Sequence, residues 1–289
     1  MSEKRSVKAA LLGLGTVGYG VYKVLRRQSP EMEQKLGTAV ELKKILVRNL
    51  EKAAKKVEDS SVLTTDWQGI LKDPEIEIVI ELMGGMEPAR TCILEAMKAG
   101  KHVVTANKDL LAADGKELMD TADSHHCDFF FEAAVAGGIP IIRPLKQCLA
   151  GNYISEVMGI INGTTNFILT KMTREGMEFA DALALAQKLG YAEADPTADI
   201  EGLDAGRKVA ILASIAFHSR VTFDDVYTEG ITKISARDIC YAKEMGYDIK
   251  LLGVARQTDS GIEARVHPMM IESAIPWRPS MTVITQYLW

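Results

Sequence analysis

The sequence is poor in the residues that build disulfide frameworks and metal centres. It has four cysteines in 289 residues, none of them in a CxxC pair: Cys92, Cys127, Cys148 and Cys240. Its histidines are scattered, and His125 and His126 are adjacent rather than spaced as two ligands on one helix face. The composition therefore predicts reduced, structural thiols in a cytoplasmic protein, and it argues against a histidine metal site.

Long apolar runs and a strong charge of one sign are also absent. No run reaches the length of a membrane span, and the N-terminus, MSEKRSVKAA, lacks the apolar core of a signal peptide. The net charge of -5 argues against nucleic acid as the main partner. There are no repeats and no low-complexity tracts. The chain is long enough for two domains, with the apolar and charged fractions of an ordinary globular protein.

A glycine-rich turn follows the first apolar segment. Residues 7–13 (VKAALLG) predict a strand, and the helix that follows begins near Tyr19. Between them lies the GxGxxG sequence Gly13, Leu14, Gly15, Thr16, Val17 and Gly18. In a strand–turn–helix context this sequence is typical of a dinucleotide site, where backbone and helix N-terminus face a pyrophosphate. The alternative is a glycine-rich turn that binds nothing.

The end of the second predicted strand, residues 41–47, indicates which dinucleotide binds. An NAD site usually has an acid here that bonds the ribose 2′-hydroxyl. This chain instead has Arg48, with Lys52 nearby, and an arginine suits a 2′-phosphate. We therefore expect NADP rather than NAD, although NAD remains possible. The alternative is that Arg48 is an exposed charge without a ligand.

Two further predicted strands end in turns that should lie at the same edge of a parallel sheet. Residues 76–82 are followed by Gly84 and Gly85, and residues 102–104 are followed by a loop that contains Lys108. Because nucleotides bind at the carboxyl ends of such strands, we expect all three residues to contact the cofactor. A lysine on a loop is otherwise an ordinary surface residue.

The acidic stretch 186–208, AQKLGYAEADPTADIEGLDAGRK, is the feature around which the second half is organised. Asp204 and Lys208 are four residues apart at the start of a predicted helix, so they share one face. The apolar run VAILASIAF follows Lys208 and should partly desolvate it, which suits proton transfer. The alternative is a weak surface ion pair beside a solvated acidic loop.

This stretch resembles the signature of the homoserine dehydrogenase family. Eleven positions match without a departure: Ala186, Gly190, Tyr191, Ala192, Asp195, Pro196, Asp199, Ile200, Gly202, Asp204 and Lys208. The resemblance implies reversible NADP-dependent interconversion of L-homoserine and L-aspartate 4-semialdehyde, on the route to threonine, isoleucine and methionine. It implies that Lys208 donates the proton and that Asp204 binds substrate and orients Lys208. It also implies that Glu193 binds the substrate's ammonium group and that Lys108 contacts both cofactor and substrate.

Two other segments match the family. Residues 132–140 resemble its Glu-Ala-x-Val-x-Gly-Gly-Ile-Pro segment, which in several members binds a monovalent cation such as sodium. By that match the ligands are Glu132, Val135, Gly137 and Ile139, whereas the residues alone favour a tight helix–sheet junction. Residues 162–166 match the family's Asn-Gly-Thr-x-Asn motif, which we expect near the substrate, although threonine at a helix start is usually a cap.

The predicted fold is α/β, with a Rossmann-type NADP-binding domain at residues 1–139. A catalytic and dimerisation domain of α+β type, on a mixed sheet, is expected at residues 140–270. Within it, residues 247–256 and 262–267 predict an antiparallel ribbon. The resemblance further implies a homodimer that acts on a small-molecule substrate.

Residues 271–289 fit no family pattern, and members of the family continue for fifty or more residues. Codons permitted for the tail from Ala274 onward, read one base out of register, spell a sequence similar to that continuation. We therefore expect a frameshift near residues 272–274 and an aberrant tail. Two alternatives follow: an inactive remnant that binds a dinucleotide or dimerises, and another NADP-linked dehydrogenase of a small acid.

Overall fold

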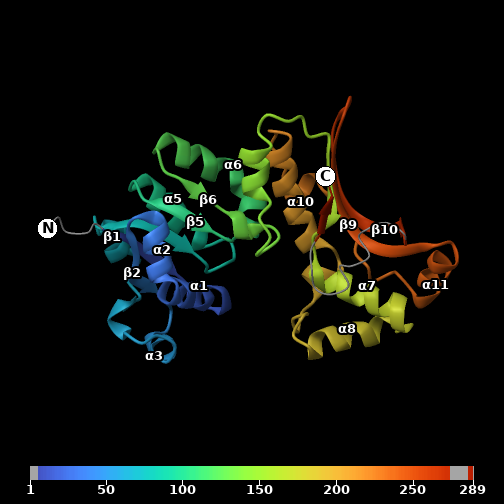
Figure 1. Cartoon of the computed structure of the whole chain (residues 1–289), viewed down its shortest axis with the longest axis horizontal. Helices are drawn as coiled ribbons and strands as arrows, with labels where there is room; N and C mark the ends of the chain where they lie inside the picture. The colour runs from blue at the N-terminus through green and yellow to red at the C-terminus, as the bar shows by residue number, and fades with distance from the viewer. Residues whose placement is uncertain (1–5, 274–285, 289) are drawn as a thin grey trace. The chain divides into compact units, whose positions relative to one another are not determined.

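The computed structural model describes residues 6–273 and 286–288 and divides the chain into two compact units, 1–134 and 135–289 (Figure 1). The division falls between Ala134 and Val135, whereas the sequence places the domain boundary after residue 139. Each unit contains its own sheet. None of the helices in the described ranges combines the length and the apolar character that a membrane crossing requires.

The first unit is built on a six-stranded parallel sheet in the order β3-β2-β1-β4-β5-β6. The strands are β1 (Ser6–Leu12), β2 (Ala39–Leu46), β3 (Leu63–Thr64), β4 (Ile76–Glu81), β5 (His102–Thr105) and β6 (Phe129–Phe130). The central strands are short apolar runs, as expected for a sheet covered on both faces. This strand order confirms the Rossmann-type prediction and puts the ligand crevice at the carboxyl ends of β1 and β4.

Helices connect these strands. They are α1 (Thr16–Arg27), α2 (Ser29–Leu36), α3 (Leu50–Ala54), α4 (Trp67–Lys72), α5 (Ala89–Lys98) and α6 (Lys108–Ser124), with 3-10 turns η1 (Ser60–Val62) and η2 (Glu132–Ala134). The helix predicted to begin near Tyr19 is α1, which begins three residues earlier, at Thr16. Helix α6 begins at Lys108 itself, so this residue lies in the first turn of a helix rather than on a loop.

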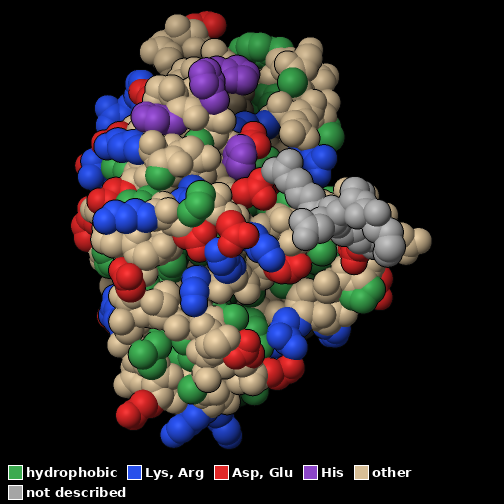
Figure 2. Space-filling model, turned by 90° about the vertical axis from the view of Figure 1, so that its left-hand side faces the viewer, with side chains coloured by type: hydrophobic (Ala, Val, Ile, Leu, Met, Phe, Trp, Pro, Cys, Tyr) green, Lys and Arg blue, Asp and Glu red, His purple; other side chains and the backbone are tan. Residues whose placement is uncertain are grey.

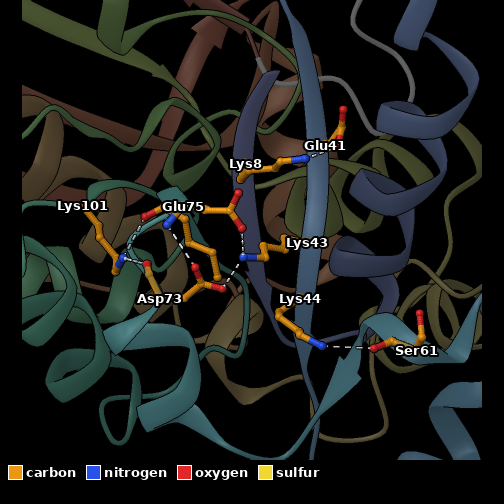
Figure 3. Close-up of polar contacts among 9 residues, drawn as sticks. Lys8, Glu41, Lys43, Lys44, Ser61, Asp73, Glu75 and Lys101 are labelled. Atoms are coloured by element: carbon orange, nitrogen blue, oxygen red, sulfur yellow. Dashed lines mark hydrogen bonds and ion pairs between the residues drawn. The ribbon is translucent and has the colours of Figure 1, made fainter. Parts of the chain in front are cut away.

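Ion pairs and hydrogen bonds of charged side chains connect segments near the amino ends of β1, β2 and β4 (Figure 3). Lys8 of β1 pairs with Glu41 of β2 at 2.6 Å, and Lys43 of β2 pairs with Asp73 at 2.6 Å. Lys101, which is almost fully buried, donates to two backbone carbonyl oxygens at 2.7 and 2.8 Å.

Figure 2 shows basic and acidic side chains interspersed on the face that it draws.

The second unit is built on a mixed sheet in the order β11-β7-β9-β10-β8. Its strands are β7 (Glu156–Ile160), β8 (Tyr227–Thr228), β9 (Tyr247–Thr258), β10 (Gly261–Glu272) and β11 (Gln286–Leu288). Strands β9 and β10 form a long antiparallel hairpin, which confirms the predicted ribbon. Strand β11 pairs with β7, whereas residues 274–285 and 289 of the expected aberrant tail lie outside the described residues.

The helices of this unit are α7 (Gly163–Glu175), α8 (Phe179–Lys188), α9 (Thr197–Ile200), α10 (Leu203–Ala216) and α11 (Ala236–Glu244), with short turns η3 (Pro144–Cys148) and η4 (Phe223–Asp225). Helix α10 packs closely on the sheet. A Cβ added at Gly253 of β9 would lie 2.5 Å from the side chain of Val209 in α10. The sheet therefore fixes the position of the helix that carries Asp204 and Lys208.

Candidate active site

The glycine turn after β1 has the geometry that a dinucleotide loop requires. Gly13 has a φ of +96°, and a Cβ there would lie 2.8 Å from the carbonyl oxygen of Leu82. A Cβ at Gly18 would lie 2.1 Å from the carbonyl oxygen of Gly13. At Gly15 a Cβ would meet nothing within 4 Å. The first and third glycines therefore close the turn and seat α1, while Gly15 leaves a face that a ligand can approach.

Two basic residues are candidates for contact with a cofactor at this turn. Arg48 is exposed immediately after β2, as the sequence predicted. Lys56, which sequence reasoning missed, donates from Nζ to the carbonyl oxygen of Leu14 at 3.1 Å. Lys56 lies 42 residues from Leu14, so only the folded structure brings it to the glycine turn.

A buried carboxylate organises the neighbouring turns. Glu81, at the end of β4, accepts hydrogen bonds from the backbone N–H of Met83 and Gly84 at 2.7 and 3.1 Å. It also accepts one from Thr105 Oγ1 of β5 at 2.6 Å. The side chain of Glu81 thus fixes the Gly84–Gly85 turn relative to the end of β5.

Asn107 continues this connection to Lys108. Its Nδ2 donates to the carbonyl oxygen of Gly85 at 2.7 Å, and its Oδ1 caps α6 by accepting from Leu110 N at 3.2 Å. Lys108 follows the cap directly. The structure therefore brings the predicted residues Gly84, Gly85 and Lys108 to one edge of the sheet.

The second unit contains an ion pair on one face of α10, between Asp204 and Lys208. Lys208 Nζ lies 2.6 Å from Asp204 Oδ2 and also donates to the carbonyl oxygen of Ile161 at 3.0 Å. The Lys208 and Asp204 side chains are 17% and 12% exposed. This burial argues against the alternative of a weak surface ion pair, because solvent screens the pair less.

A network extends from this pair to Asn162, the first residue of the motif expected near the substrate, for which the sequence indicates no specific role. Asn162 Nδ2 donates to Asp204 Oδ2 at 2.9 Å and to Asp199 Oδ1 at 2.6 Å. Asp199 lies in α9 and Asp204 in α10. Burial raises the pKa of Asp199, against the hydrogen bond from Asn162, which lowers it. Asn162 therefore connects two carboxylates at the start of α7.

Glu193 is not part of this network. It is exposed on the loop after α8, and Gln187 Nε2 donates to its backbone carbonyl at 3.1 Å. Among residues 6–273, no hydrogen bond or ion pair joins its carboxylate to Asp204 or Lys208. The carboxylate is therefore accessible to a ligand from solvent.

The segment 162–166 forms the cap and first turn of α7. Thr164 Oγ1 donates to the carbonyl oxygen of Tyr191 at 2.8 Å, so the turn is tied to the acidic loop. Lys250 Nζ of β9 donates to Asn166 Oδ1 and Thr170 Oγ1, both at 2.9 Å. Burial lowers the pKa of Lys250 to about 8.

The segment expected to bind a cation has an unusual backbone. Ala136 and Gly137 both have positive φ, of 63° and 58°. Within the described residues, no backbone hydrogen bond is donated to the carbonyl oxygens of Val135, Gly137 or Ile139. Glu132 lies in η2 just before them. Three acceptor oxygens without backbone donors suit a hard cation. Across the described residues, no three His, Cys, Asp or Glu side chains gather into a metal-binding group.

Comparison with known families gives two matches. Residues 13–132 match the family described as the NAD binding domain of homoserine dehydrogenase, and residues 140–280 match the family described as homoserine dehydrogenase. The homoserine dehydrogenase of Synechocystis is 50% identical over 275 residues, which is 94% of this chain and 63% of the relative. The Bacillus subtilis enzyme is 46% identical, with the same coverage. The chain thus spans 63% of the length of these curated relatives.

Solved structures similar to this chain are also described as homoserine dehydrogenases. The crystal structure of a homoserine dehydrogenase from Thiobacillus denitrificans is 48% identical, with a TM-score of 0.94, and the match covers 98% of this chain and 66% of that one. The Staphylococcus aureus enzyme at pH 6.0 is 41% identical, with a TM-score of 0.82, covering 94% and 69% of the two chains. A hyperthermophilic archaeal homoserine dehydrogenase in complex with NADPH is 26% identical, with a TM-score of 0.77 and coverage of 94% and 84%.

Proposed function

The chain belongs to the homoserine dehydrogenase family, and from this premise we propose that it catalyses the reversible, NADP-dependent interconversion of L-homoserine and L-aspartate 4-semialdehyde. The strongest support in the site itself is the largely buried pair of Lys208 and Asp204, 2.6 Å apart. A pair of this kind fits a reaction that moves one proton to or from a substrate oxygen.

The residues of the first unit fit a nicotinamide dinucleotide. The open face at Gly15 and the N-terminus of α1 suit a pyrophosphate. Arg48, with Lys56 near the same turn, favours NADP over NAD, because a 2′-phosphate needs positive charge. A bound cofactor would supply the hydride. Gly84, Gly85 and Lys108 would line the same edge of the sheet.

The residues of the second unit would bind the substrate, stabilise the charge that develops on it and transfer a proton. When the aldehyde is reduced, negative charge develops on its oxygen and must be neutralised. Lys208 donates a proton to that oxygen, and in the reverse direction it accepts one. Asp204 orients the ammonium group of Lys208 and binds substrate. The exposed carboxylate of Glu193 binds the substrate's ammonium group, and Lys108 adds positive charge beside the nicotinamide. The reaction requires no cysteine nucleophile.

Further proposals follow from the family. The enzyme is a cytoplasmic homodimer on the route to threonine, isoleucine and methionine. The carbonyl oxygens of Val135, Gly137 and Ile139, together with Glu132, bind a monovalent cation such as sodium. The acceptor oxygens without backbone donors support the cation proposal.

The test is oxidation of NADPH in the presence of L-aspartate 4-semialdehyde, followed by the absorbance of the reduced nicotinamide. We expect turnover with this substrate and none with other small oxo acids. Binding of NADPH without turnover would support the alternative of an inactive remnant. Turnover with another small oxo acid in preference to the semialdehyde would support a different NADP-linked dehydrogenase.

A further inference from the structure

Asn162 has a fixed orientation at the start of α7. It is the N-cap of this helix, and its Oδ1 accepts hydrogen bonds from Thr165 N at 2.8 Å and from Thr165 Oγ1 at 2.9 Å. Only the oxygen of the side-chain amide can accept a hydrogen bond from a backbone N–H, so the cap fixes the positions of Oδ1 and Nδ2. The nitrogen of the amide must then point away from α7.

That nitrogen donates to two carboxylates at once. Its partners are Asp199 Oδ1 at 2.6 Å and Asp204 Oδ2 at 2.9 Å. With two acceptor and two donor positions filled, the amide has used its whole hydrogen-bonding capacity. Asn162 is only 4% exposed, so water cannot readily replace these bonds. Asparagine is the residue that can cap a helix and donate to two acids at the same time.

The amide of Asn162 and the ammonium group of Lys208 share one acceptor oxygen. Asp204 Oδ2 accepts from both Asn162 and Lys208, so the amide helps to fix the oxygen that orients the ammonium group. The charged groups that act on Asp199 are Asp204 and Lys208 of α10, while Asn162 and Thr164 of α7 face it as polar groups. Without the Asn162 amide, the carboxylates of Asp199 and Asp204 would have Lys208 as their nearby cation but no hydrogen-bond donor between them.

We propose that Asn162 is a positioning residue, which bridges Asp199 and Asp204 so that Asp204 presents a fixed oxygen to Lys208. This inference rests on the proposed function, since it assigns Lys208 the proton-transfer role. It adds a residue whose effect on the reaction passes through Asp204 rather than through contact with substrate. It also makes Asp199 part of the same charge network.

The variant Asn162→Asp separates bridging from capping. Aspartate has the same shape and caps a helix as well as asparagine, but when ionised it donates nothing and adds a third negative charge. Asn162→Ala removes both functions. Ser235→Ala is the matched control, because Ser235 caps α11 by accepting from Asp238 N at 3.2 Å and is not part of this network.

Two measurements test the proposal in the full chain. Carboxyl-carbon NMR titration follows Asp199 and Asp204 without any need for turnover, and the pH profile of NADPH oxidation follows the reaction. In Asn162→Asp and Asn162→Ala we expect the pKa of Asp199 to rise by about one unit or more. We expect the acidic limb of the kcat profile to move upward with it, and kcat to fall by about tenfold or more. Ser235→Ala should change neither.

The outcomes separate this proposal from the proposed function. If both carboxylates titrate in Asn162→Asp and Asn162→Ala as they do in the unmodified chain, the bridge has no electrostatic effect and the proposal is wrong. If Asn162→Asp does not fold, Asn162→Ser, which retains a capping oxygen, replaces it in the same titration. A chain with no turnover but with shifted carboxylate titrations would reject the proposed function and retain the bridge.

Discussion

Lys208 and Asp204 form an ion pair one helical turn apart whose side chains are 17% and 12% exposed. The chain offers a direct comparison, because Lys116 and Asp120 form a pair of the same spacing in α6 whose side chains are 63% and 62% exposed. Sequence spacing alone cannot separate the two. Burial distinguishes them, and it makes the α10 pair a candidate for chemistry while the α6 pair stays a solvated contact.

Replacing Lys208 should stop the reaction while the cofactor still binds. We expect Lys208→Ala to lower kcat by about 10²- to 10⁴-fold, the usual contribution of a positioned proton donor. Binding of NADPH, measured by fluorescence titration, should not change. Lys116→Ala, which breaks the exposed pair of equal spacing, is the control and should keep full turnover. Unchanged turnover in Lys208→Ala would remove this residue from its proposed role.

The glycine turn predicts opposite outcomes for two similar substitutions. Gly18→Ala puts a methyl group 2.1 Å from the Gly13 carbonyl oxygen, so we expect a loss of stability of about 1–3 kcal/mol or more. Gly15→Ala meets no protein atom within 4 Å and should change stability by less than about 0.5 kcal/mol. Its methyl group would instead obstruct the pyrophosphate and weaken NADPH binding by about tenfold or more.

Urea unfolding and NADPH titration of both glycine variants check this prediction. A Gly15→Ala variant that binds NADPH normally would show that the open face of the turn is not where the cofactor lies.

Arg48 should determine the preference between the two nicotinamide dinucleotides. A charge-assisted hydrogen bond to a 2′-phosphate contributes about 1.5–3 kcal/mol, so Arg48→Ala should weaken NADPH binding by about 10- to 100-fold. Binding of NADH should stay the same. The measurement is a pair of fluorescence titrations, with Lys72→Ala of α4 as a control charge removal. Equal losses for both cofactors would contradict recognition of the 2′-phosphate.

Lys250 should make the free energy of unfolding vary with pH in the alkaline range. Its pKa in the folded chain is about 8, below the ordinary value of 10.5, so between these values the unfolded chain binds more protons. The free energy of unfolding should therefore rise with pH across this window, by at most about 3 kcal/mol. Lys250→Met should lack this rise in urea unfolding, while the exposed control Lys116→Met should keep it. Parallel pH curves for Lys250→Met and the unmodified chain would disprove the assignment.

Much of the fold was predictable because local patterns determine it. The apolar runs that became β1, β4 and β5 end in glycine or small-residue turns, and the order of a nucleotide-binding sheet follows once such strands alternate with helices. Helix α2 was missed, because its sequence SPEMEQKL has no buried residue and therefore no apolar periodicity to detect.

The candidate site was predictable only in part, for a different reason. Asp204 and Lys208 were identified because they lie one helical turn apart, an apolar run follows Lys208, and the stretch resembles the family signature. The motif at residues 162–166 was expected near the substrate, but the contacts of Asn162 with two carboxylates, 37 and 42 residues away, follow from no local pattern. The role of Glu81 was missed for the same reason. Nothing in the sequence indicates that a glutamate at the end of a buried strand will accept hydrogen bonds from the backbone N–H groups of the next turn.

Strands β7 and β9 have a consequence for how the second unit forms. Glu156 and Arg256, which face each other across them, are 100 residues apart in the chain. Asn162, Asp199, Asp204 and Lys208 all lie inside the loop that this pairing closes. Closing a loop of this length costs chain entropy and slows folding, because the cost is met before the pairing stabilises the sheet. A growing polypeptide can therefore complete this sheet only after β9 has been synthesised, so a nascent chain that stops before β9 has every residue of the network but not the scaffold that assembles it.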